Sequence, residues 1–582
     1  MSFCFRGFSL HEALAMLEED DVNTESITLL PPNNACGNIT DEDSGDEDQL
    51  DINNLPPSMI QNQVEVNIRV NEEDWSSEDE LPLSTLQNKE KPKDNLKTKK
   101  KKVYQFVKQD LPAYDYVFPE ENTFTNLSTP TELFELFFDD EILSMFTEET
   151  NRYAQQKNKI TVVDVSEIKC FLGILLLSGY SSVSRRRMYW ENSKDACNVL
   201  VSEAISRDRF EFIMSHLHIA NNENLDKNDK FAKLRPLFDS LNNKFLEKAP
   251  LVENHSIDEA MVPYNGRHGC KQFIHNKPIR YGFKLWVGTT RLGYINWFEP
   301  YQGASTYVNL DYKVLGVGAS VVLSYADRLR TRWPEPKFQF FFDNFFSSPS
   351  LIEALLDKGI VSTGTMRENR IHMSTLKSST DMKKENRGFF DYTKISGQNI
   401  IFVKWNDNNI VTFGSSAAGI APVNSVKRYS QKEKKFIQVN QPQLVKLYNK
   451  NMGGVDRSDQ NISQYRVQIR GKKWYFSLIS HCLDMAMTNA WHLHKYREGK
   501  MDQLAFRRSV ATTFLTQNKK SFAFRRGKNQ QNNELRYDRL DHLVVPQEKQ
   551  TRCGLCHSKT TTRCKKCDIG LHVKCFVNYH TQ

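Results

Sequence analysis

The chain has 582 residues, 39% of them hydrophobic and 26% charged, and this length predicts about three or four structural units. Its formal net charge of +7 is unevenly spread: residues 1–88 hold 20 acidic side chains and two arginines, so the remaining residues carry +25. A basic body favours a polyanionic partner. No apolar run approaches the ~18 residues of a membrane-spanning helix, and acidic residues soon follow the apolar N-terminus. We therefore expect neither a membrane span nor a secretory signal.

Residues 1–112 are predicted to be mostly disordered, because acidic runs such as 41–48 cannot bury enough apolar surface to offset chain entropy. Ser9 and Glu12 form a capping-box pattern, which predicts a short helix at Ser9–Asp20, with or without a docking partner. The basic run Lys97–Lys102 fits a nuclear import signal or a nucleic-acid contact, and it also fits a solvated linker.

From about residue 113 to 250, apolar residues recur at helical spacing. Thr129, Pro130 and Glu132 combine an N-cap, a proline at the first helical position and a capping box. Further helices are predicted at Val165–Ser178, Arg207–Ile219 and Leu234–Leu246.

Beyond about residue 250, strands rich in aromatic and β-branched residues alternate with helices, which predicts an α/β fold with a mixed sheet. The predicted strands are His255–Val262, Arg280–Thr289, Tyr294–Phe298, Phe338–Phe342 and Val361–Thr365, and the helices are Gly316–Arg330 and Ser347–Asp357. Residues 372–440 interrupt this order as a β-rich insertion, with strand-like pieces at Asn399–Trp405 and Ile410–Phe413. Helices return at Gln443–Tyr448 and Trp474–His494.

Three aspartates stand where strands or glycine-rich turns end. Asp258 belongs to the first strand, Asp343 directly follows an aromatic strand, and Asp456 follows two glycines at the start of a helix whose face it shares with Asp459. Crevices at the carboxyl ends of strands are where α/β sheets bind ligands. Oxygen ligands suit Mg²⁺, and a pair of such ions can drive chemistry on phosphate. Each aspartate taken alone is equally compatible with a structural or solvated strand end.

Five motifs together are highly specific: SIDE at Ser256–Glu259 followed by Gly266-Arg267, NKPIRYGFK at Asn276–Lys284, FDNFFSS at Phe342–Ser348, TGT at Thr363–Thr365 and YNKNMGGVD at Tyr448–Asp456. Through them the chain resembles the piggyBac family of DNA transposases, and most closely its vertebrate members derived from transposable elements. The resemblance covers roughly residues 125–582, with a weaker match in the acidic N-terminus.

The resemblance implies an RNase H-like core in which Asp258, Asp343 and Asp456 bind two Mg²⁺ ions, with Asp459 as a supporting carboxylate. It implies cut-and-paste transposition of double-stranded DNA at TTAA sites: hydrolytic nicking, a hairpin on the transposon end, reopening of the hairpin, and joining of the 3′-hydroxyl to target DNA. A homodimer and a nuclear location follow from the same resemblance. Some domesticated relatives lack one of the acids, whereas all three motifs retain theirs here.

The expected domains follow from these signals. They are a disordered acidic tail at 1–112, a helical dimerisation and DNA-binding domain at 113–250, the first part of the core at 251–371, a β-rich insertion at 372–440, the third catalytic motif at 441–460, a second helical DNA-binding segment at 461–515, a basic linker at 516–550 and a zinc domain at 551–582.

Two groups of basic residues are candidates for DNA contact. Those near the first aspartate are expected to contact phosphates; they are Arg267, Lys271, Lys277 and Arg280. Those of the second helical segment combine cations with an aromatic ring, which suits stacking on a distorted or unpaired base; they are Arg470, Lys472, Lys473 and Trp474. Trp474 also opens an apolar helix, so a place in the core is the alternative.

The last 32 residues carry the strongest chemical signal, a cluster with the spacing of zinc ligands; its members are Cys553, Cys556, Cys564, Cys567, His572, Cys575 and His580. Small segments of this kind obtain much of their folding energy from metal. In a cross-brace, Cys553, Cys556, His572 and Cys575 bind one Zn²⁺. Cys564, Cys567 and His580 bind a second Zn²⁺, with His557 as an awkwardly placed candidate for the fourth ligand. The chain therefore has one or two zinc sites.

Three functions fit the sequence. The first is a transposase, and the second is a domesticated descendant that binds DNA or chromatin in the nucleus without cutting it. The third is a zinc-finger adaptor or ubiquitin ligase, because the C-terminal module alone also fits a RING or PHD-like protein-binding finger. The three aspartates favour the first function over the second, and only residues 551–582 support the third.

Overall fold

A computed structural model gives the arrangement of the chain, which forms two compact units, residues 1–100 and 101–582. Side chains are described for residues 104–119, 129–191, 193, 195–274, 277–303, 306, 311–371, 375–431, 433–517, 537 and 540–581. In the first unit the described backbone consists of three antiparallel strands in the order β1-β3-β2, where disorder was expected; they are β1 (Ser2–Ser9), β2 (Thr24–Leu29) and β3 (Gln63–Arg69). Residues 10–20 of the predicted helix and the basic run up to residue 102 lie outside the described residues.

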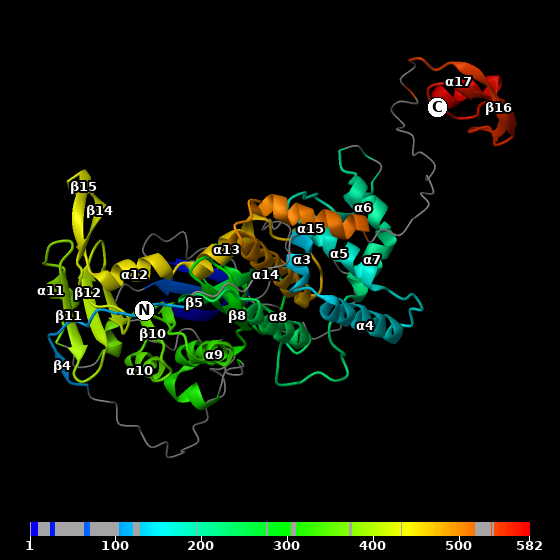
Figure 1. The fold of residues 1–582 in the computed structure, drawn as a ribbon. Helices are drawn as coiled ribbons and strands as arrows, with labels where there is room; N and C mark the ends of the chain where they lie inside the picture. The colour runs from blue at the N-terminus through cyan, green and yellow to red at the C-terminus, as the bar shows by residue number, and fades with distance from the viewer. Residues whose placement is uncertain are drawn as a thin grey trace. The chain divides into compact units, whose positions relative to one another are not determined.

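The helical region of the second unit joins two stretches that are far apart in the sequence (Figure 1). The first stretch holds α3 (Pro130–Glu135), α4 (Asp140–Gln156), α5 (Val165–Ser178), the 3₁₀-helix Arg186–Trp190, α6 (Val199–Ala204), α7 (Arg207–His216) and α8 (Arg235–Glu247). The second holds α14 (Trp474–Tyr496) and α15 (Gln503–Gln517). The capping box of Thr129 and Glu132 is present at the start of α3, as the sequence predicts.

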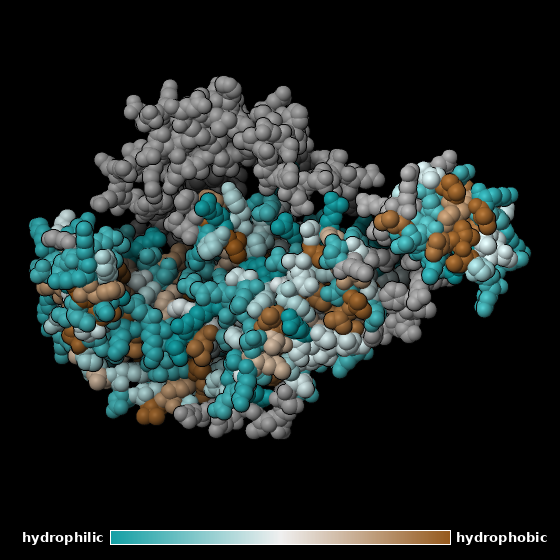
Figure 2. Space-filling view, turned by 90° about the horizontal axis from the view of Figure 1, so that it is seen from above, coloured by the Kyte–Doolittle hydropathy of each residue, from teal (hydrophilic) through white to brown (hydrophobic). Residues whose placement is uncertain are grey.

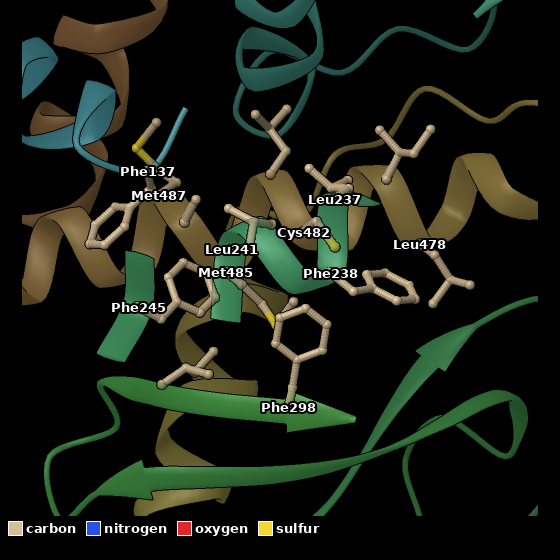
Figure 3. Packing of buried hydrophobic residues seen from close by; sticks show 14 of the residues in the cluster. Phe137, Leu237, Phe238, Leu241, Phe245, Phe298, Leu478, Cys482, Met485 and Met487 are labelled. Atoms are coloured by element: carbon tan, nitrogen blue, oxygen red, sulfur yellow. The ribbon is translucent and has the colours of Figure 1, made fainter. Parts of the chain in front are cut away.

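These two stretches share one core. A Cβ placed on Gly173 of α5 would lie 3.0 Å from the Cβ of Phe514 in α15, so these helices pack closely. Asp484 of α14 and Arg507 of α15 form a buried ion pair with a 2.8 Å contact. Figure 3 shows α8 between α14 and strand β8 (Ile295–Pro300), with the rings of Phe238 and Phe298 5.4 Å apart. The helical region therefore packs directly on one edge of the central sheet.

The central sheet has ten strands and is mixed. Its first part runs β6-β7-β5-β9-β10, and β8 pairs with β7. Strand β5 is antiparallel to β7 and parallel to β9, and β9 is parallel to β10. Helices α9 and α10 stand on either side of β9 in the chain. The bounds are β5 (Asn254–Pro263), β6 (Lys271–Phe273), β7 (Tyr281–Thr290), α9 (Val317–Arg332), β9 (Gln339–Phe342), α10 (Pro349–Asp357) and β10 (Val361–Thr365).

The predicted insertion extends this sheet. Strand β13 pairs antiparallel with β10, and β12, β11 and the short β4 follow in order. These strands are β11 (Phe390–Ile395), β12 (Ile401–Asn406), β13 (Ile410–Ser415) and β4 (Phe106–Val107). Between β10 and β11 lies the short α11 (Ser379–Met382). A separate two-stranded hairpin follows, made of β14 (Asn424–Ser430) and β15 (Lys435–Gln441). The chain then returns to the core through α12 (Gln443–Asn451) and α13 (Gly454–Gln464).

The C-terminal module is small. It consists of the hairpin β16 (Val544–Arg552) and β17 (Lys559–Cys564), followed by α17 (Val573–Thr581). Its buried cluster contains Leu571, Tyr579 and three cysteines, Cys553, Cys564 and Cys575. Figure 2 shows apolar residues gathered on this module, where Val573 and Val577 are exposed. Among the described residues, no helix combines the length and apolar character needed to cross a membrane.

Candidate active site and zinc sites

Two of the predicted aspartates lie next to each other because of the strand register. Strands β5 and β9 are parallel, and Ile257 is the register partner of Phe342. Asp258 and Asp343 each come one residue later, at the end of this pairing. The chain turns sharply after β9, where the Asp343 Oδ1 accepts a 2.9 Å hydrogen bond from the Phe345 backbone N–H. The register therefore brings the two carboxylates to the same edge of the sheet.

The third motif reaches this edge because a helix packs closely on β5. The Ser256 hydroxyl in β5 donates a hydrogen bond to the Met452 carbonyl, just before α13 begins. A Cβ on Gly454 would lie 2.5 Å from the Thr290 carbonyl oxygen and 2.6 Å from the Thr289 hydroxyl, so only glycine fits there. This close approach places Asp456 in the first turn of α13.

Burial and the neighbouring charges act together on these carboxylates. Burial raises the pKa of Asp258 well above its ordinary value, and the charges of Glu259 and Asp343 raise it further. Burial, followed by the charge of Glu259, raises the pKa of Asp343 to about 6. Burial raises the pKa of Asp459 to about 7; Asp456 adds to this increase, whereas the cations Arg466 and Lys277 oppose it.

Glu259 is a further carboxylate of this group that the sequence reasoning missed. It directly follows Asp258 in β5, and alternation along a strand predicts the opposite face. Its charge nevertheless acts on Asp258, Asp343 and Asp459. We define the carboxylate centre as the five acids Asp258, Glu259, Asp343, Asp456 and Asp459.

One lysine among the candidate DNA-binding residues belongs to this centre. The Lys277 Nζ lies 3.4 Å from the Glu259 Oε1. Burial acts to lower the pKa of Lys277, but Glu259 and Asp258 outweigh it and the net shift is upward. Lys277 is therefore a resident cation among the carboxylates. Of the other three candidates, Arg267 and Arg280 are exposed, whereas the Lys271 Nζ donates to the Asn265 carbonyl at 3.1 Å.

A second missed residue shapes the turn after Asp343. The Arg370 Nη1 donates to the Ser347 carbonyl at 2.6 Å and to the Asn344 carbonyl at 2.7 Å. One guanidinium thus joins both ends of the turn that carries Asp343. Its sequence signal was weak, since Arg370 follows the TGT motif by five positions in a polar loop.

The carboxylate centre has the oxygen ligands that hard divalent cations prefer. Among the described residues, however, three or more ligand atoms converge to within 4.8 Å of one another only in two cysteine–histidine sets and not in these carboxylates. The centre concentrates oxygen donors from β5, the end of β9 and α13 in a partly buried place, and burial makes their mutual repulsion costly. Mg²⁺ is commonly held by a few carboxylates together with substrate phosphates. Asp258, Asp343 and Asp456 are the residues that would hold it, and Asp459 and Glu259 are adjacent.

The residues of the second helical segment divide into two kinds. Arg470 and Lys472 are exposed. The ring of Trp474 is partly buried and lies 4.3 Å from the ring of His268, and the Lys473 Nζ lies 5.0 Å from the centre of the Tyr153 ring. This packing agrees with the core alternative for Trp474, and stacking on a base stays a prediction.

The C-terminal module brings two sets of four ligands together. Cys553, Cys556, His572 and Cys575 form one set, and in each set the ligand atoms lie within 4.8 Å of one another. In tetrahedral zinc sites, Zn–S and Zn–N lengths of about 2.3 and 2.0 Å imply sulfur–nitrogen separations of about 3.6 Å. The His572 Nδ1 lies 3.3 Å from the Cys556 Sγ and 4.0 Å from the Cys575 Sγ. This geometry fits Zn²⁺.

The second set corrects the expected fourth ligand. It consists of Cys564, Cys567, His580 and His542, and the His542 Nδ1 lies 3.4 Å from each of the two sulfurs. The expected candidate, His557, is exposed and belongs to neither set. His542 precedes Cys564 by 22 positions and lies in the predicted linker, but the β16–β17 hairpin brings it back to the cysteines. The two sets interleave along the chain as a cross-brace.

Comparisons with known proteins show the family of this chain. Residues 129–491 match the family described as transposase IS4. The human piggyBac transposable element-derived protein 3 is 46% identical over 99% of this chain and 100% of its own length. The human piggyBac transposable element-derived protein 2 is 42% identical over 95% of this chain and 93% of its own. A piggyBac transposase solved as a synaptic complex with hairpin DNA has the same fold, with a TM-score of 0.57 and 20% identity, over 77% of this chain and 96% of that one. The chain therefore belongs to the piggyBac transposase family.

Proposed function

We propose that this protein is a piggyBac-type DNA transposase that cuts and joins double-stranded DNA at TTAA sites through hairpin intermediates. The observation that carries the proposal is the carboxylate centre. It is supported by the β5–β9 register, which ends next to Asp258 and Asp343, and by α13, which carries Asp456 in its first turn and packs on β5. The strand order β8-β7-β5-β9-β10, antiparallel and then parallel, supports an RNase H-like core.

Each part of the centre has a role in this proposal. Two bound Mg²⁺ ions would activate a water or a 3′-hydroxyl and stabilise the leaving oxygen. Asp258, Asp343 and Asp456 would hold these ions, and Asp459 would support them. Lys277 neutralises part of the negative charge before a phosphodiester arrives and then offers a cation to its phosphate. Arg370 keeps the turn after Asp343 in place.

The remaining parts of the chain serve DNA binding. The exposed Arg267, Arg280, Arg470 and Lys472 contact phosphates, and the C-terminal module binds two structural Zn²⁺ ions and the transposon ends. The solved relative is a synaptic complex with hairpin DNA, which supports DNA as the partner. The helical region forms a homodimer, and the protein acts in the nucleus.

A second candidate function is DNA or chromatin binding without cleavage. The names of the human relatives describe proteins derived from a transposable element, which favours this alternative. The two candidates share the DNA-binding surface and differ only in whether the carboxylate centre performs chemistry.

A cleavage assay distinguishes the two candidates. The full chain, with its zinc sites loaded and no chelator present, is incubated with or without added Mg²⁺ and with duplexes taken from the DNA that flanks its own coding sequence. Mg²⁺-dependent nicking next to TTAA, followed by a hairpin product, is the expected result. Binding that weakens steeply with salt but gives no product at any divalent metal concentration would contradict the transposase and favour the second candidate.

A further inference from the structure

The β14–β15 hairpin has two different faces. One face packs on the insertion: Val439 is 1% exposed, and Val426 and Ile437 contact the same cluster. The opposite face carries a directly paired Tyr429 and Phe436, which are 51% and 60% exposed. Exposed apolar surface that gathers in one place often marks a binding site, and this face presents two adjacent rings on one support.

The hairpin is held firmly in place. The Arg428 Nε lies 3.1 Å from the Asp407 Oδ2, and the Arg387 Nη1 donates to the Tyr429 carbonyl at 3.1 Å. The Trp405 Nε1 donates to the Asn440 carbonyl at 2.8 Å. Both strands are thus tied to the sheet by side chains, although they belong to no larger ladder (Figure 1). The exposed rings are presented on a fixed support.

The charge of the hairpin indicates the kind of partner. Residues 424–441 contain five lysines and arginines and one glutamate, a formal charge of +4. The Lys427 Nζ lies 4.6 Å from the centre of the Phe436 ring. Lys434 and Lys435 are exposed at the turn, where the Lys435 Nζ lies 2.9 Å from the Glu433 Oε2. Aromatic rings surrounded by cations match the bases and phosphates of a nucleic acid.

We propose that the β14–β15 hairpin is a DNA-binding ribbon. Lys427, Lys434 and Lys435 contact phosphates, and the Tyr429–Phe436 pair contacts bases. A two-stranded ribbon fits the major groove of duplex DNA, and the same rings can stack on bases of an opened strand. This inference rests on the proposed function, since it gives the DNA an additional contact away from the carboxylate centre.

An acidic protein segment is the main rival partner. The chain carries one itself, in residues 1–88 with 20 acidic side chains. Its acidic run 41–48 contains no aromatic residue and Trp75 is the one ring in the acidic run 72–80, whereas every nucleotide presents a base, so the exposed aromatic pair favours DNA. The rival is therefore included as an outcome of the test.

The test uses the full chain and fluorescence anisotropy. The probes are a labelled duplex of ~30 base pairs, about three helical turns, and the corresponding single strand. The double variant Tyr429→Ser/Phe436→Ser should weaken binding to at least one probe about tenfold or more. Tyr429→Phe keeps the ring and should bind like the wild type. Val314→Ser, which removes a 67% exposed apolar side chain outside the proposed DNA-binding regions, is the control.

Charge variants test the phosphate contacts. The slope of log K against log salt concentration reports the number of phosphate contacts. In the double variant Lys434→Glu/Lys435→Glu this slope should fall in magnitude by about two. Lys384→Glu, which changes an exposed lysine of the same insertion outside the hairpin, is the control and should change it much less. The duplex and single-strand arms show which form of DNA the rings contact.

Three results would overturn the inference. Failure of the wild type to bind either probe would contradict the proposed function and the inference together. Wild-type binding that both hairpin variants retain would contradict the inference alone. Hairpin-dependent binding of a labelled peptide of residues 38–50, with unchanged DNA affinity, would assign the ribbon to the acidic tail instead.

Discussion

The carboxylate centre and the zinc module both gather charged ligands, but the chain builds them in opposite ways. The carboxylate centre takes its residues from positions 258 to 459, and a ten-stranded sheet with a large apolar core positions them. The ligands of the zinc module all lie within the 39-residue segment from His542 to His580. Three of the five residues in its buried core are cysteines.

This difference separates two uses of metal. In the carboxylate centre the fold comes first, and it holds together acids that repel one another, so bound metal would serve chemistry. In the zinc module the fold has little else to stabilise it, so metal binding is folding free energy. Removal of metal should therefore leave the first region folded and inactive, and the second unfolded.

The largest expected effect is on activity. Asp343→Asn removes a negatively charged ligand from the turn after β9, so Mg²⁺-dependent cleavage should fall by about three orders of magnitude or more. DNA affinity and the thermal midpoint of the body should change little, because the amide oxygen of the substituted side chain can still accept from the Phe345 N–H. A strand-cleavage assay and a filter-binding assay on one preparation measure both quantities. Unchanged cleavage would refute the metal assignment.

The second expected effect is on the zinc content. His542→Ala removes one ligand of the second set, so bound zinc should fall from about two ions per chain to about one, measured by elemental analysis. His557→Ala is the matched control and should keep both ions. Because each set stabilises the module, hydrogen exchange should show faster opening of β16 and β17 in the first variant only. If His557→Ala loses the zinc instead, the cross-brace assignment is wrong.

The third expected effect tests the packing that positions Asp456. Gly454→Ala places a Cβ against the Thr290 carbonyl, so α13 must shift. We expect a loss of about 1–3 kcal/mol in the free energy of unfolding and a cleavage rate about tenfold lower. Gly453→Ala, whose Cβ would meet no atom within 4 Å, should stay within about 0.5 kcal/mol of the wild type. Chemical denaturation of the two variants compares them, and equal losses would contradict the role of this close approach.

Local patterns predicted much of the fold because they act over a few residues. The predicted helix at Val165–Ser178 and strand at Val361–Thr365 coincide with α5 and β10. The pairing of β13 with β10 joins residues about 50 positions apart, so it cannot be predicted from the periodicity of either segment. That pairing makes the predicted insertion a continuation of the central sheet.

The same limit explains the site residues that were missed. Asp258, Asp343 and Asp456 can be recognised in short motifs. Glu259 acts through its charge, although the alternation of side chains along a strand predicts that it points to the face opposite Asp258. His542 precedes the cysteine-rich segment in the sequence, and it reaches Cys564 and Cys567 only because the β16–β17 hairpin folds back on itself. The exposed Tyr429 and Phe436 alternate like core residues, so their sequence pattern alone indicates a buried face rather than a surface.

The smallest expected effect uses pH to separate the two regions. In the absence of Mg²⁺, burial raises the pKa of Asp343 to about 6 and that of Asp459 to about 7, above the ordinary value near 4. The folded state then binds protons more readily than the unfolded state, so this contribution to stability is complete below pH 4 and is lost as pH rises through 6–7. Protons compete with Zn²⁺ for cysteine and histidine, so the zinc module has the opposite dependence.

Acidification from pH 7 to 5 should therefore stabilise the carboxylate centre and destabilise the zinc module. The free energy of unfolding is measured against pH for the wild type and for Asp343→Asn. The difference between the two curves isolates the contribution of Asp343 from those of the other titrating groups. We expect the wild type to gain on the order of 1–2 kcal/mol relative to the variant over this range, after allowance for partial exposure. Added Mg²⁺ should remove most of this gain, because bound metal keeps the carboxylates ionised. A difference between wild type and variant that is independent of pH, or independent of Mg²⁺, would show that Asp343 does not share a charged, metal-binding centre with its neighbours.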